Sequence, residues 1–132
     1  MSTLSLRCIT AAFVCLALGL GLGVSFAAQR ALGATLRPLH VELNLWGWST
    51  LLIYGFAYHM LPRFAGRPLG RPRLAATQAG LAIGGVALAV LGWAASAAHI
   101  PYALLIGAAG ALAQLIAALL FGWQIGRLLL RS

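Results

Sequence analysis

Long apolar runs dominate this chain, and short polar segments separate them. Charged side chains are absent from Cys8–Gln29, from Leu43–Pro62 and from the 53 residues of Leu74–Gly126. A helix that crosses a bilayer needs roughly 20 mostly apolar residues. The first two runs are therefore each long enough for one crossing, and the third is long enough for two.

The third run has a natural break at His99-Ile100-Pro101. Proline favours the first turn of a helix and disfavours helix in the residue before it. The second run can begin earlier, near Leu39, if Glu42 is accommodated in the span. The pattern predicts an all-α fold, an integral membrane four-helix bundle in a single membrane domain over 1–132, with helices at about 8–29, 39–62, 74–98 and 101–127.

Composition narrows the class of protein further. The 132 residues include nine arginines, one glutamate, no lysine and no aspartate, and only 8% are charged against 62% hydrophobic. Soluble domains carry about a quarter charged residues, so a soluble enzyme and a disordered chain are both excluded. The net charge of +8 does not indicate a nucleic-acid partner, because the few arginines lie between apolar runs rather than along one helix face.

The arginines predict how the helices are oriented in the membrane. Only Arg30 and Arg37 fall on one side of the predicted bundle. Seven arginines fall on the other side, which are Arg7, Arg63, Arg67, Arg71, Arg73, Arg127 and Arg131. Positive charge accumulates in cytoplasmic loops. We therefore expect both termini to be cytoplasmic, in a bacterial cytoplasmic (inner) membrane and surrounded by membrane lipid.

The first predicted helix has an alternative interpretation. Arg7, an apolar run and Phe26-Ala27-Ala28 also fit a secretory signal peptide with a small-residue cleavage site. The apolar run is longer than the usual signal core of about 7–15 residues. A retained helix is favoured, and cleavage would leave the orientation of the other helices unchanged.

The second predicted helix carries the unusual polar residues of the chain. At 100° per residue, Asn44 and Gly47 lie within about 40° of His40 on one helix face, and Leu51 and Tyr58 lie near the same line. An imidazole, an amide and a glycine gap could form a cradle for a flat prosthetic group, because the glycine leaves room for a porphyrin ring. Glu42 points about 160° away, toward another helix or the interface.

The three histidines differ in their predicted depth. His59 ends the second helix on the inner side, about 28 Å from His40 at 1.5 Å per residue, so these two cannot share a metal. His40 and His99 are both on the outer side and could ligate one haem iron from its two faces. Alternatively, each is an interfacial histidine at a helix end that simply contacts water.

The second helix and the loop after it resemble a known family. The residues that carry this likeness are Leu36-Arg37-Pro38-Leu39-His40, Asn44, Gly47, Gly55, Tyr58 and the run Leu61–Leu69. They resemble the second transmembrane helix of haem-copper oxidase subunit I, in particular the branch of cbb3-type cytochrome oxidase and nitric oxide reductase. The resemblance implies that His40 ligates a low-spin haem b near the periplasmic side.

The departures from that family are large. Subunit I has many more helices than this chain, and its copper ligands, its high-spin haem ligand and the second low-spin haem ligand lie on helices that are missing here. We therefore expect a truncated, stand-alone relative that is not an autonomous oxidase. Its second haem ligand would come from His99, from His40 of another protomer in a homodimer, or from a partner such as a respiratory oxidase subunit.

Three functions follow from these residues. The first is a haem b-binding protein of respiratory electron transfer, or one that supports an oxidase complex. Its metal ligands would be His40 and His99, its cofactor contacts would include Asn44 and Gly47, and Arg37 would pair with a propionate. The second is a cofactor-free assembly or structural subunit, in which His40 and Asn44 form interhelical hydrogen bonds. The third is a small dimeric four-helix transporter that uses Glu42 as its membrane-embedded acid.

Overall fold

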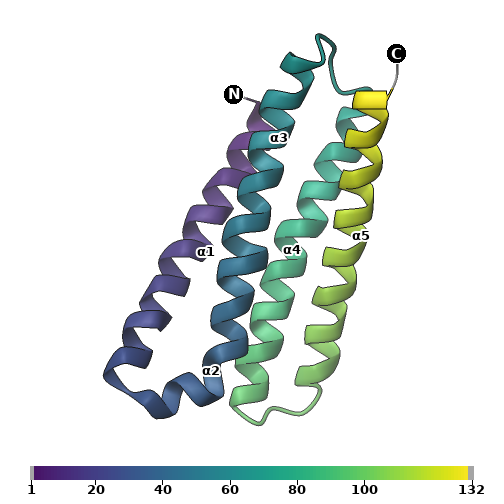
Figure 1. Ribbon diagram of the computed structural model, residues 1–132. Coiled ribbons are helices and arrows are strands. Elements are labelled where there is room, and N and C mark those ends of the chain that lie inside the picture. Colours follow the sequence, from purple (N-terminus) through teal and green to yellow (C-terminus); the bar gives the residue numbers. More distant parts are fainter. Residues whose placement is uncertain (1, 131–132) are drawn as a thin grey trace.

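The computed structural model describes residues 2–130, which form long helical segments lying side by side (Figure 1). The elements are α1 (Thr3–Ala28), α2 (Arg30–Glu42), η1 (Leu43–Thr50), α3 (Leu51–Phe64), α4 (Pro72–Ala97) and α5 (Ala103–Leu130). Three of them, α1, α4 and α5, are long and apolar enough to cross a membrane. The prediction of an all-helical chain with membrane-crossing helices is therefore confirmed.

The second helical segment is longer than its apolar run. It begins at Arg30 rather than near residue 39, and α2 continues directly into η1 and α3 with Pro38 and Pro62 inside the helix. Arg30 and Arg37 lie before the charge-free run, and their side chains are exposed at this end. A helix can be longer than the apolar run that it contains, because it can extend beyond the hydrocarbon layer with its charged side chains in water.

The middle of this segment is a π-helix. In η1 the backbone hydrogen bonds span five residues instead of four. Two side chains follow the same spacing, since Ser49 Oγ donates to the Asn44 carbonyl at 3.0 Å and Thr50 Oγ1 donates to the Leu45 carbonyl at 2.9 Å. The wider turns break the constant 100° per residue, so residues before and after η1 do not keep the expected common face.

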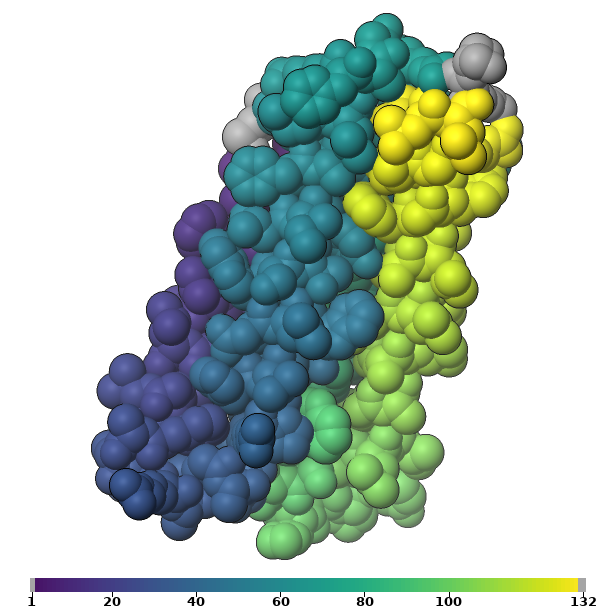
Figure 2. Space-filling model, in the orientation of Figure 1, coloured from purple at the N-terminus to yellow at the C-terminus, as the bar shows by residue number. Residues whose placement is uncertain are grey.

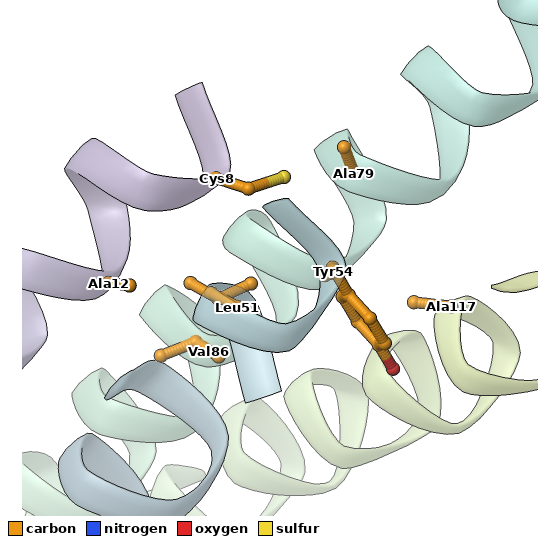
Figure 3. Close-up of a cluster of buried hydrophobic side chains, with 8 residues drawn as sticks. Cys8, Ala12, Leu51, Tyr54, Ala79, Val86 and Ala117 are labelled. Atoms are coloured by element: carbon orange, nitrogen blue, oxygen red, sulfur yellow. The ribbon is translucent and has the colours of Figure 1, made fainter. Parts of the chain in front are cut away.

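The buried core lies where all four segments meet. Figure 3 shows Cys8 and Ala12 of α1 facing Leu51 of α3, with Val86 of α4 nearby and Tyr54 directed toward Ala117 of α5. These core residues are mostly small, which lets the helix backbones approach closely. Cys8 and Cys15 are free thiols, and Cys8 is completely buried, as expected for small apolar core residues.

Helices α4 and α5 form an extended antiparallel pair with glycines at their contact. A Cβ atom at Gly92 would lie 2.5 Å from the Cα atom of Gly107. Two pairs of glycines on these helices have the four-residue spacing typical of close helix contacts. A Cβ atom at any of them would meet nothing within 4 Å, and they are Gly80, Gly84, Gly122 and Gly126. Spacing alone therefore does not identify the glycines at which these helices touch.

The start of α1, the α3–α4 connection and the end of α5 lie at one end of the molecule (Figure 1). This is the end at which most arginines gather, whereas Arg30 and Arg37 of α2 lie at the other end; Arg131 lies outside the described residues. The grouping is the one that the charge pattern predicted. That the arginine-rich end faces the cytoplasm stays a prediction.

We expect Gly92→Ala to destabilise the protein by about 1–3 kcal/mol, because the new methyl group meets the backbone of Gly107, which has no flexible atoms to yield. Unfolding in SDS micelles, followed by helicity, measures this loss. Gly84→Ala is the matched control on the same helix, with open space at the new Cβ, and should be neutral or slightly stabilising. Equal effects of the two substitutions would contradict the close contact.

Candidate functional site

His40 lies in the last turn of α2 and faces α1. Its Nδ1 atom is 2.9 Å from the carbonyl oxygen of Gly19, and the ring of Phe26 lies 5.4 Å from the imidazole, centroid to centroid. A carbonyl oxygen only accepts hydrogen bonds, so Nδ1 donates in this contact, with Asn44 Nδ2 also 3.4 Å from it. In the neutral ring with this tautomer, Nε2 carries the lone pair; Nε2 makes no hydrogen bond and is not enclosed by the protein.

This arrangement is the one that metal-ligating histidines use. Such a histidine donates its second ring N–H to a carboxylate or a backbone carbonyl, which fixes the tautomer and the orientation of the ring. In His40 the carbonyl of Gly19 takes this role, from a helix different from the one that carries the histidine. Nε2 is thus the atom through which His40 could bind a metal, and that it does so stays a prediction.

Asn44 and Gly47 share the α1-facing side of His40, but both are occupied by helix packing. The Asn44 amide donates to the His40 carbonyl at 2.8 Å, and its Nδ2 atom lies 2.5 Å from where a Cβ of Gly19 would be. A Cβ at Gly47 would lie 2.6 Å from the Cβ of Cys15. The gap that was expected to receive a porphyrin ring is therefore filled by α1.

His99 and Arg37 lie apart from the α1-facing side of His40. His99 is exposed in the α4–α5 turn, where its backbone N–H donates to the Ser96 carbonyl at 3.0 Å. His40 faces α1, whereas His99 follows α4, which packs against α2. That the two histidines ligate one iron stays a prediction. Arg37 is exposed and lines a surface groove next to Glu42.

A second feature of the site is a groove that contains the only acidic side chain of the protein. It has a volume of about 430 Å³ and lies between the α2–η1 junction and the α4–α5 pair. In Figure 2 the lower half of α5 stands away from α2 and η1, and atoms of α4 are visible between them. The residues that give the groove its chemistry are Glu42, Trp46, Trp93, Ser96 and Gln114.

Glu42 is buried in the wall of this groove, with 9% of its surface exposed. Gln114 Nε2 of α5 donates to its Oε1 atom. Its Oε2 atom makes no hydrogen bond and is open to the groove. The expectation that Glu42 points away from the His40 side, toward another helix, agrees with this placement. Its position near a predicted helix end did not indicate that it would be this deeply buried.

Three further polar side chains link the helices at the arginine-rich half of the molecule. Tyr58 donates its hydroxyl hydrogen to Gln78 Oε1 at 2.9 Å and accepts from Gln124 Nε2 at 3.3 Å. Gln78 Nε2 donates to the Ala117 carbonyl at 3.2 Å. This buried chain of hydrogen bonds connects α3, α4 and α5.

The sequence contains a signal for these polar contacts, which is the presence of single glutamines in apolar runs outside the second helical segment. Gln78, Gln114 and Gln124 are isolated polar residues within long apolar runs, and all three are buried. A polar side chain in a membrane span has to find a partner inside the protein. Each of these glutamines could thus have been predicted to face another helix.

Comparisons with known proteins give no match to a family model, to a curated protein or to a solved structure. The resemblance to haem-copper oxidase subunit I therefore depends on the residues of the second helical segment alone. The side chains of this site that can carry out chemistry are the imidazole of His40 and the carboxyl group of Glu42.

We expect Gly47→Ala to destabilise the protein, because its methyl group would overlap the side chain of Cys15. The double substitution Gly47→Ala with Cys15→Gly removes the side chain that the new methyl group would meet and should recover most of the loss. Thermal unfolding in detergent, followed by circular dichroism, measures both. If the double variant is no more stable than Gly47→Ala alone, the contact between Gly47 and Cys15 is not the cause.

Proposed function

We propose that this chain is a haem b-binding membrane protein of respiratory electron transfer, and that His40 supplies one axial ligand while the second ligand comes from outside the chain. The observation that carries the proposal is the hydrogen bond from His40 Nδ1 to the Gly19 carbonyl, which orients the ring and leaves Nε2 without a protein partner. A bound haem iron would accept and release one electron.

The described residues fit such a haem only in part. His40 fits as a ligand, and Arg37 lies exposed one turn earlier in α2, where it can approach a propionate. Asn44 and Gly47 serve the packing of α1 and would not contact the ring. His99 is exposed in the α4–α5 turn, whereas His40 faces α1, and we therefore assign the second ligand to His40 of a second protomer or to a histidine of an oxidase-type partner subunit.

The proposal includes the location of the site. With the arginine-rich end in the cytoplasm of a bacterium, the His40 end would lie near the outer surface of the inner membrane. A haem bound there, between one helix pair and a neighbouring subunit, would be positioned to exchange electrons on that side.

Haem reconstitution tests this function. Detergent-solubilised protein incubated with haem b is expected to show a Soret band and a pyridine haemochrome, and His40→Ala should abolish both because the ligating nitrogen is removed. His99→Ala is the matched control and should leave the spectrum unchanged, since the proposal takes the second ligand from outside the chain and His99 is exposed.

A stoichiometry of one haem per two chains would identify a homodimer as the source of the second ligand. No haem binding, or equal spectra for the wild type and His40→Ala, would overturn the proposal. Haem-free protein that co-purifies with oxidase subunits would favour the cofactor-free assembly subunit instead.

A second candidate function is favoured by the position of Glu42. A nearly buried acid without a cationic partner, in an apolar groove with two indole rings, can exchange a proton for a lipophilic cation. This is the arrangement that a small dimeric transporter needs, with the groove reaching the surface on the side of Arg37 and Trp93.

Transport in liposomes tests this alternative. With an imposed proton gradient, we expect proton-coupled movement of tetraphenylphosphonium, and Glu42→Gln should reduce it by at least about tenfold because the exchangeable charge is lost. His59→Gln, which changes an ionisable residue at the opposite end of the same segment, should have no effect. Equal transport by the wild type and Glu42→Gln would exclude this function.

A further inference from the structure

A small basic cavity lies at the arginine-rich end of the molecule, far along the helices from His40. Its volume is about 120 Å³, and its walls are the α3–α4 connection and the last turns of α5. Figure 2 shows these two segments next to each other at this end. The side chains that define its chemistry are Arg67, Arg71, Arg127, Trp123 and Gln124.

Three guanidinium groups thus line one cavity, and none of them pairs with a carboxylate within residues 2–130. The only acidic side chain of the chain, Glu42, lies in the separate groove between α2 and α5. Two of the guanidinium groups are held by the same indole, with the Cζ atoms of Arg71 and Arg127 at 5.2 Å and 5.0 Å from the centroid of Trp123. Cation–π attraction fixes both charges, but it does not remove their mutual repulsion.

Arg67 gives an independent sign that an anion is expected. Its Nε atom is buried and has no hydrogen-bond partner in the described part of the protein. A buried donor without an acceptor costs free energy, and the cost is higher for a charged group. A negative charge in the cavity that Arg67 lines would offset part of this cost.

The start of α4 adds a further attraction for an anion. Helix α4 has 26 residues and begins at Pro72, directly after the cavity residue Arg71, and no side chain caps its first turn. The first backbone N–H groups of a helix lack partners and carry partial positive charge. Phosphate groups bind at such positions.

We propose that this cavity binds the phosphate group of an anionic phospholipid. The volume suits a phosphodiester, and the position at the end of the membrane-crossing helices is where lipid headgroups lie. The last turns of α5, which form one wall of the cavity, also carry exposed apolar surface, because Trp123, Leu129 and Leu130 are 41%, 54% and 84% exposed. These surfaces can pack against the acyl chains of the same lipid, which free phosphate lacks. The site does not depend on haem binding by His40.

Native mass spectrometry of the full chain in detergent tests the proposal. Phosphatidylglycerol and phosphatidylcholine with identical acyl chains compete for the protein, and we expect retention of phosphatidylglycerol in preference. Arg71→Gln with Arg127→Gln should weaken this binding by at least about tenfold. Arg30→Gln with Arg37→Gln is the matched control, with the same change of net charge at the other end, and should retain the wild-type preference.

Each remaining outcome supports or overturns the proposal. Equal loss in both pairs of variants would show an effect of net charge alone, and equal retention of the two lipids would show that the cavity does not select the headgroup. Competition by inorganic phosphate at the same concentration would identify a small-anion site instead of a lipid site. Trp123→Leu keeps every charge and should reduce the preference several-fold, which tests the cavity if the double arginine variant fails to fold.

Discussion

Polar groups in a membrane protein have to satisfy one another, because lipid offers no hydrogen bonds. In this protein that constraint determines how the helical segments are joined. Tyr58 forms hydrogen bonds with both Gln78 and Gln124 and so joins three helices. Glu42 accepts a hydrogen bond from Gln114. Small residues between these points allow the close approach that makes the hydrogen bonds possible.

The same constraint explains why the two ends of the molecule differ. At one end, His40 meets a backbone carbonyl of α1 and Glu42 meets an amide of α5, so both ionisable groups are oriented by hydrogen bonds to a neighbouring helix. At the other end, arginines of a loop and of α5 surround an indole, with no carboxylate among the described residues beside them. The first end presents a lone pair and an acid, whereas the second presents only positive charge.

The apolar runs were sufficient to predict the number and kind of helical segments, since helix length in lipid follows from hydrophobic thickness. They could not predict the start at Arg30, because charge marks the limit of the hydrocarbon layer and not the end of a helix. A helical wheel placed His40, Asn44 and Gly47 together, but it contains no information on which neighbour covers that side. Tertiary packing places Cys15 in the space beside Gly47, and no helical wheel of one segment contains that information. This packing distinguishes His40, a candidate ligand, from Asn44 and Gly47, which pack against α1.

The π-helix η1 divides one long segment into two parts that both pack against α1 but make different polar contacts. In the part before it, His40 contacts the Gly19 carbonyl of α1, and in the part after it, Tyr58 hydrogen-bonds Gln78 of α4 and Gln124 of α5. Removal of one residue within Leu43–Thr50 would restore ordinary helical spacing and rotate one part by about 100° relative to the other. The π-helical turns of η1 thus set the rotation of one part about the helix axis relative to the other. Each part can therefore direct its polar side chains toward its own hydrogen-bond partners.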